Sequence, residues 1–188
     1  PPRSTLFPYT TLFRSDDFNS IGYGFGIDET GHLGFIVADG KEFDAVISEI
    51  PLQRHIWYFI GASYDASTGR ATLHQMGVVN RYNSLWGKVT PMDYDSHVSE
   101  TLRFKPKHAP DISFLVGGTW DFHANRGKFV NELYSGKVDR PGVVSRALSR
   151  EEFDHICSGG KPPKNDILAY WDTDRKSTRL NSSHSETS

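Results

Sequence analysis

The sequence predicts an all-β fold, an antiparallel β-sandwich of two sheets with one short C-terminal helix. Apolar residues alternate with polar residues or glycine at period two in several short runs, which is typical of strands with one buried face. Turn residues separate these runs at regular spacing. A single helix-start signature occurs near the end of the chain, so the helical content is expected to be small.

The first three predicted strands form a meander. Residues 21–27 alternate between large apolar residues and Gly or Asp, and Leu33, Phe35 and Val37 alternate again after a turn at 29–31. The dipeptide Asp39-Gly40 is a hairpin signal, and residues 43–47 resume a run rich in branched side chains.

A central hairpin follows the meander. Residues 56–64 form a nearly continuous apolar and aromatic run, as expected of a strand covered on both faces, and residues 71–76 pair back after a turn at 65–69. Further strands are predicted at 112–116 and 128–134. Ser149 and Glu152 form a capping box that starts the helix, and Gly159-Gly160 ends it.

Residues 79–110 lack sustained alternation and predict a long loop inserted in the sandwich. Loops of this length in compact domains are usually functional or packed on a neighbour. We therefore expect the insertion to contact another domain or subunit.

Both flanks of the chain match the translation of short-read sequencing adapters. Residues 5–15 and residues 174–184 correspond codon by codon to the adapters of the two ends of a library insert, in the expected order. We interpret residues 1–15 and 174–188 as artefacts and residues 16–173 as one domain of a gene fragment. The flanks are expected to be extended and poorly packed, apart from chance contacts by their apolar residues, which are Leu6, Phe7, Leu12 and Phe13.

Charge and composition exclude several functional classes. The flanks hold five cations and two anions, so the net charge of −2 becomes −5 for residues 16–173. An acidic domain without a run of Lys or Arg is not expected to bind nucleic acid. No apolar run approaches the ~20 residues of a membrane helix. The lone Cys157 fits a reducing compartment and also fits secreted bacterial domains.

Several segments resemble the laminin-G-like, concanavalin-A-like jelly-roll module. Trp57 opens the central strand, Tyr64-Asp65 ends it, and Thr68-Gly69 leads to the next strand, as in that family. Further similar segments are a strand ending in Gly at 115–118, a closing strand at 134–139 and a helix segment at 146–152. The resemblance implies that Trp57 and Tyr64 fill the sandwich core.

The exit from the helix resembles the large subunit of N,N-dimethylformamidase-type amidohydrolases. The similar residues are Pro162-Pro163 after the helix and the strand 167–172, which ends in Trp171-Asp172. The resemblance implies a parent enzyme that hydrolyses a small formamide at an iron centre held by Tyr and Glu outside this fragment. The fragment itself is then expected to hold no cofactor and to be a non-catalytic accessory domain that contacts a neighbouring domain or subunit.

One polar stretch is a candidate ligand site. Residues 120–126 predict a loop between two strands, with Trp120 as an aromatic platform and Asp121, His123 and Asn125 as polar groups. Sugar recognition uses an aromatic face and planar polar groups in this way. The alternative function is therefore a carbohydrate-binding module of a secreted bacterial protein. The same residues also fit a strand connection whose Asp and Asn bond their own backbone.

Other candidate sites are weaker. The histidines share no short spacing, which disfavours a zinc site; they are His32, His55, His74, His97, His108 and His155. Asp93, Asp95 and Glu100 lack the glycine-anchored spacing of a calcium loop. On a helix, Cys157 and His155 point apart and form a poor nucleophile pair. No strand carries the alternating carboxylates of a jelly-roll glycosidase.

Overall fold

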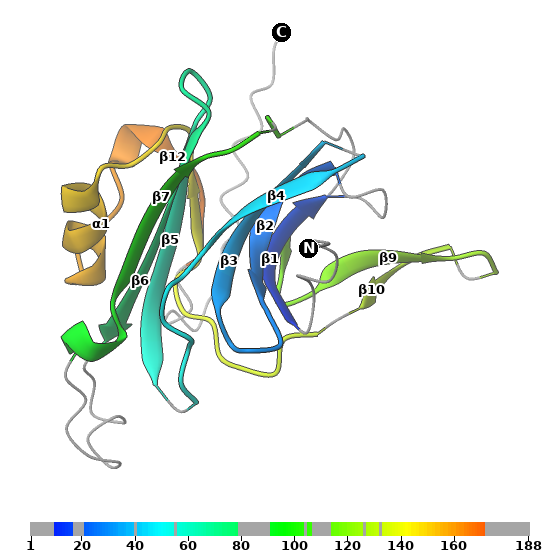
Figure 1. Ribbon diagram of the computed structural model, residues 1–188, viewed down its shortest axis with the longest axis horizontal. Coiled ribbons are helices and arrows are strands. Elements are labelled where there is room, and N and C mark those ends of the chain that lie inside the picture. The colour runs from blue at the N-terminus through cyan, green and yellow to red at the C-terminus, as the bar shows by residue number, and fades with distance from the viewer. Residues whose placement is uncertain are drawn as a thin grey trace, which may run out of the picture.

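The computed structural model has the predicted all-β architecture, with antiparallel sheets and one α-helix (Figure 1). It describes residues 10–16, 21–39, 41–54, 56–78, 91–103, 105–106, 114–125, 127–131 and 133–171. Two larger sheets pack against each other, and two small two-stranded sheets and the helix lie around them.

The larger sheet has five strands. In spatial order they are β4 (Phe43–Ile47), β3 (Leu33–Asp39), β2 (Ile21–Ile27), β1 (Thr10–Asp16) and β8 (Leu115–Val116). The predicted meander is confirmed as β2, β3 and β4, which pair antiparallel in sequence order. The predicted strand at 112–116 is described only from residue 114 onward.

Strand β1 comes from a segment that we expected to lie outside the domain. Thr10–Asp16 pairs with β2 from Thr10↔Ile27 to Asp16↔Gly22 and also pairs with β8. Threonine and aromatic residues favour extended backbone, and β2 offers unpaired backbone groups at its edge. An extended segment of any origin can therefore occupy this position. Residues 1–9, with Leu6 and Phe7, and residues 172–188 lie outside the described part.

The second sheet has three strands, β5 (Trp57–Asp65), β6 (Arg70–Val78) and β7 (Ser96–Thr101), and the central hairpin is confirmed as β5–β6. Strand β7 and the 3₁₀ turn Pro91–Tyr94 lie within residues 79–110, so this stretch is not one long loop. Its single core-facing Val98 gives too little alternation to predict a strand. Residues 79–90 lie outside the described part, and their contact with a neighbour stays a prediction.

The core lies between the two sheets. Its buried apolar residues come from both sheets and from the segment after β7; they are Leu33, Phe35, Val37, Val46, Ala71, Leu73 and Leu102. Tyr64 packs against this cluster as predicted, together with Ile60 and Ala62 of the same strand face. Trp57 does not: it is half-buried and alternates with these residues, on the strand face of Phe59 and Gly61.

The helix α1 (Arg150–Cys157) covers the outer face of the β5–β6–β7 sheet (Figure 1). Its one buried side chain, Phe153, contacts Phe59 at a ring-centroid distance of 6.2 Å and His74 at 4.2 Å. A Cβ atom at Gly61 would lie 2.5 Å from the Phe153 ring, so the close approach requires glycine. This sheet is therefore covered on both faces.

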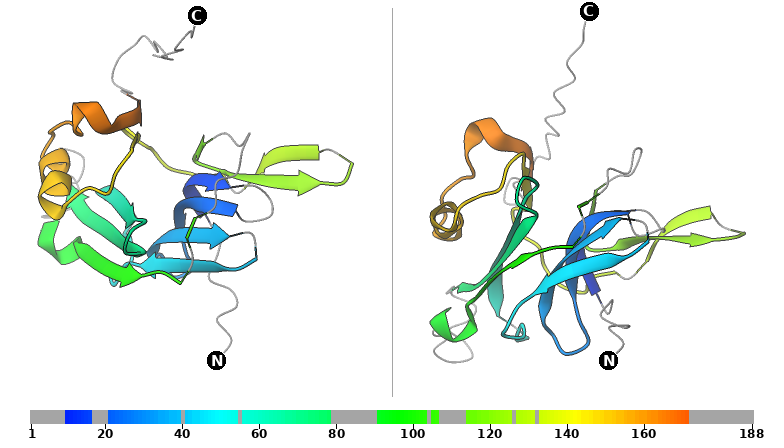
Figure 2. Two further views of the ribbon diagram at one scale, coloured as in Figure 1. Left: turned by 90° about the horizontal axis from the view of Figure 1, so that it is seen from above. Right: turned by 45° about the horizontal axis from the view of Figure 1, so that its top comes forward.

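Two small two-stranded sheets complete the fold. Strands β9 (Thr119–His123) and β10 (Gly127–Asn131) form a ribbon that projects from the body (Figure 2). Strands β11 (Gly142–Val144) and β12 (Ile167–Tyr170) pair after the turn Lys164–Asp166. The predicted loop 120–126 is thus mainly a strand, and 134–139 is irregular rather than a closing strand. Within it, Gly136 lies against the ring of Tyr134.

Candidate functional site

The predicted ligand residues lie on the projecting ribbon. Trp120, Asp121 and His123 belong to β9, and Asn125 is exposed in the turn before β10. Successive positions of a strand face opposite sides, so the position of Trp120 alternates with positions 121 and 123. The strand therefore places position 120 on the face opposite to positions 121 and 123, and Asn125 lies beyond the end of the strand.

One face of the Trp120 indole is occupied by a neighbour. The Nζ atom of Lys128 on β10 lies 4.4 Å from the ring centroid. A cation at this distance is attracted by the electron-rich face of the ring. A sugar stacking on that face would have to displace Lys128, which disfavours glycan binding there. Glycan binding by this chain stays a prediction.

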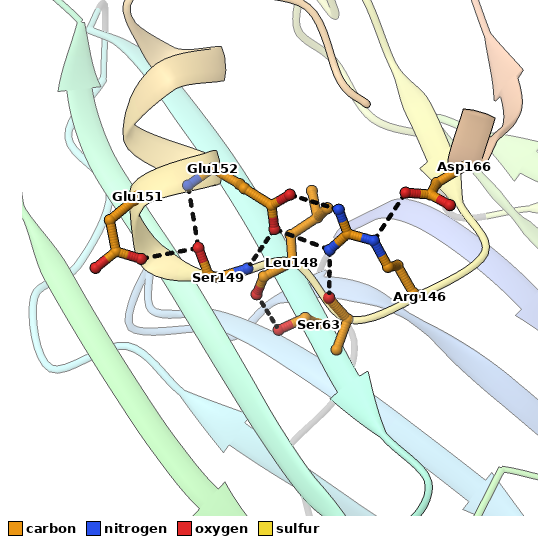
Figure 3. A network of polar contacts seen from close by, with 8 residues as sticks. Ser63, Arg146, Leu148, Ser149, Glu151, Glu152 and Asp166 are labelled. Carbon is orange, nitrogen blue, oxygen red and sulfur yellow. Dashed lines mark hydrogen bonds and ion pairs between the residues drawn. The ribbon is translucent and has the colours of Figure 1, made fainter. Parts of the chain in front are cut away.

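A network of hydrogen bonds and ion pairs holds the start of α1 (Figure 3). The predicted capping box is confirmed: Ser149 Oγ accepts from the Glu152 N–H at 3.3 Å, and Glu152 Oε2 accepts from the Ser149 N–H at 2.9 Å. Arg146 donates to Glu152 and, through Nε at 2.7 Å, to Asp166. Ser63 Oγ donates to the Leu148 carbonyl at 3.4 Å.

Hydrogen bonds set the protonation states in this network. The bond from Arg146 holds the pKa of Glu152 down at about 2, and the bonds to Glu152 and Asp166 raise the pKa of Arg146. Glu152 and Arg146 therefore stay charged at neutral pH, and neither is poised to exchange a proton. The arrangement clamps three segments together: the start of α1, the segment after β11 and the turn before β12.

A histidine pair lies beneath α1. His74 of β6 and His97 of β7 are directly opposite in register, and their Nδ1 atoms are 2.9 Å apart. Burial lowers the pKa of His74 to about 4, with further lowering by His97 and Arg150. The pKa of His97 is also lowered, first by burial and then by Arg150. Both rings are therefore neutral near pH 7, one donating through Nδ1 and the other accepting.

Sequence spacing could not have revealed this pair, because 22 residues separate the two histidines in the sequence. The missing information was strand β7, whose register with β6 brings the rings together. The Arg146–Asp166 bond was missed for a similar reason, since it joins segments that meet only through the β11–β12 pairing.

The carboxylates, imidazoles and thiol of the described residues do not gather into a metal site. The described residues contain no group of three or more His, Cys, Asp or Glu side chains that could hold a metal ion. Asp95, a calcium candidate, instead accepts a hydrogen bond from the Gly77 N–H at 2.9 Å. The iron that the resemblance implies was expected outside this fragment, and that expectation remains a prediction about the parent chain.

Cys157 and a cavity beside α1 are two further features of the helix region. Burial raises the pKa of the half-buried Cys157, which keeps the thiol protonated and poorly nucleophilic. An open cavity of about 360 Å³ beside α1 is lined by Glu151, Glu152, His155, Ile156, Lys161 and Pro163. Glu152 belongs to the clamp, and Glu151 accepts from the Ser149 hydroxyl, so both carboxylates already have structural partners. No described helix is long and apolar enough to span a membrane.

Comparison with known proteins gives two informative matches. The chain is 35% identical over 161 residues to the N,N-dimethylformamidase beta subunit of Paracoccus aminophilus and 32% identical over 161 residues to the subunit of the same name from an Alcaligenes species. Each match covers 85% of this chain and 21% of the relative. No protein-family model matches the chain, so the laminin-G-like resemblance stays a prediction.

The matched relatives are named beta subunits. The large subunit that we expected from the sequence is therefore corrected to a beta subunit. The chain spans about a fifth of the length of these relatives. Identity of 32–35% over 161 residues shows that this chain is homologous to part of the N,N-dimethylformamidase beta subunit.

Proposed function

We propose that this chain is a non-catalytic accessory β-sandwich of an N,N-dimethylformamidase-like beta subunit, in which it stabilises a neighbouring domain or subunit. The observation that carries the proposal is the homology over 161 residues, which amounts to 21% of each relative. On this proposal the formamide hydrolysis belongs to the remaining part of the parent subunit.

The roles of the polar side chains support an accessory role. Arg146, Glu152 and Asp166 bind one another and hold α1, and the Gln75 amide donates to the carbonyls of Ile50 and Tyr94. The buried His74 lies under Phe153 instead of lining the open cavity. Polar groups with these partners stabilise a scaffold, whereas catalytic groups must be able to reach a substrate.

A domain exchange tests the proposal. Residues 16–171 of this chain replace the matched segment of the Paracoccus aminophilus beta subunit, and a second variant lacks that segment altogether. We expect the exchanged subunit to assemble with its partners and to hydrolyse N,N-dimethylformamide. The deletion variant should fail to assemble, and the isolated chain should hydrolyse nothing.

Two results would contradict the proposed accessory role. Formamide hydrolysis by the isolated chain would contradict the non-catalytic role. Full assembly and full activity of the deletion variant would contradict the stabilising role. Both assays use the same purified subunits, analysed by size-exclusion chromatography with light scattering and by product release.

A further inference from the structure

The β9–β10 ribbon, together with Leu133 after it, projects from the sandwich and is called the arm here (Figure 2). Among the described residues, β9 and β10 form a two-stranded sheet of their own. A two-stranded ribbon is at best marginally stable in water unless another element packs against it. Among the described residues β9 contacts β1, but the arm's own pairing stays two-stranded, so further packing would stabilise it.

The base of the arm is fixed to the sandwich. Thr119 is buried, and Tyr134, which packs against the core, donates its backbone N–H to the Gly117 carbonyl at 2.9 Å. A Cβ atom at Gly118 would lie 2.8 Å from Val130, so the two sides of the base approach closely. The arm thus leaves the body in a defined direction.

Apolar side chains are exposed on both faces of the arm. Phe129 is 36% exposed and Val130 is 41% exposed, and neighbouring positions of a strand face opposite sides. Leu133 is 72% exposed, and it lies near Gly118 on the side of Val130. A single flat surface could cover only one of these two faces, so the occupant must enclose the ribbon.

We propose that the arm inserts into the remainder of the same beta subunit and is enclosed by it. This inference rests on the proposed function and names the surface through which it acts. About four fifths of the length of each relative lies outside the match, which supplies a covalently linked occupant at high effective concentration. A symmetric contact between two copies would pair like patches and leave the opposite face of each ribbon uncovered.

Hydrogen–deuterium exchange of the arm amides tests the inference in full-length protein. A hybrid subunit, in which residues 16–171 of this chain replace the matched segment of the Paracoccus aminophilus subunit, is compared with the isolated chain. We expect the amides of β9 and β10 to exchange at least about tenfold more slowly in the full-length subunit, because burial of the ribbon suppresses its opening.

Matched variants separate the arm from other exposed apolar positions. Replacing both Val130→Asp and Leu133→Asp should remove the extra protection in the full-length subunit. Leu168→Asp should leave it intact, because Leu168 is 68% exposed but lies on β12, outside the arm. If the hybrid subunit does not fold, hydrogen–deuterium exchange is measured on the natural Paracoccus aminophilus subunit instead. The match covers 161 of the 188 residues and so includes the arm wherever it begins.

Two results would overturn the inference. Equally fast arm exchange in the isolated chain and in the full-length subunit would show that nothing encloses the ribbon. Concentration-dependent dimerisation of the isolated chain with the same arm protection would identify a second copy as the occupant. A full-length subunit that assembles and hydrolyses formamide while its arm exchanges fast leaves the proposed function standing and refutes the arm alone.

Discussion

His74 is the clearest pH-sensitive group of the described structure. It is 3% exposed, lies beside His97 and packs against Phe153, and the cation of Arg150 adds to the cost of charging it. Its pKa of about 4 in the folded state lies below the ordinary value of 6.5. The unfolded chain therefore binds this proton more readily than the folded chain between these two pH values.

Stability should fall as the pH is lowered from about 6.5 to about 4. The expected loss from His74 is on the order of 3 kcal/mol, because each pKa unit corresponds to about 1.4 kcal/mol. Urea unfolding at a series of pH values measures it. In His74→Gln the slope over this range should flatten, whereas the exposed His155→Gln should keep it; an unchanged slope in His74→Gln would refute the assignment.

Trp120 separates the accessory role from the glycan-binding alternative. Since Lys128 lies over its indole, we expect no glycan to bind the isolated chain on a glycan array. Trp120→Ala should accordingly leave the array signal at background. A reproducible hit that disappears in Trp120→Ala but persists in Phe43→Ala, a change at another exposed aromatic residue, would favour a carbohydrate-binding module.

At the scale of elements, α1 depends on Phe153 for its attachment to the sheet. Phe153 is 4% exposed and fills the space above Gly61. Phe153→Ala should lower the free energy of unfolding by about 3–5 kcal/mol, the usual cost of emptying such a site. Phe43→Ala, at a residue 41% exposed, is the control and should cost far less. Chemical denaturation of both variants decides the point, and equal losses would contradict this role of Phe153.

The Arg146 clamp should hold the helix to the β11–β12 sheet. Arg146→Ala removes the bonds to Glu152 and Asp166, so the melting temperature should drop, and more strongly at low salt, where ion pairs are less screened. The matched control is Arg54→Ala, at an exposed arginine outside the network. If both variants melt at the same temperature, the clamp contributes nothing to stability.

The sequence predicted the elements whose burial follows a simple period. Strands β2, β3, β5 and β6 alternate or are continuously apolar, and the Ser149 cap is local in sequence. Strand β7 escaped because Val98 is its single apolar residue, so the strand shows no period-two pattern. The Arg146 clamp and the His74–His97 pair join segments that are far apart in the sequence. Residue spacing along the chain therefore could not predict them.

Strand β1 shows a different limit of sequence reasoning. Residues 10–15 belong to the flank that we interpret as adapter translation, yet they occupy the position between β2 and β8. Backbone pairing needs only an extended segment, so strand formation does not depend on a natural origin of the residues. We expect the parent gene to encode different residues for this position.

At the scale of the whole molecule, the chain is a β-sandwich homologous to about a fifth of an N,N-dimethylformamidase beta subunit. Its core lies between two sheets, α1 covers one outer face, and the arm projects with apolar side chains exposed. These features fit a domain whose remaining surfaces are completed by a larger protein.

The most direct test of this account is a long sequencing read of the parent DNA across both ends of residues 16–173. We expect one reading frame that continues beyond Thr173 into the rest of a beta-subunit-like protein. The codons before Asp16 should differ from those of residues 1–15. A frame that stops soon after Thr173, or that encodes both flanks as they stand, would contradict this account.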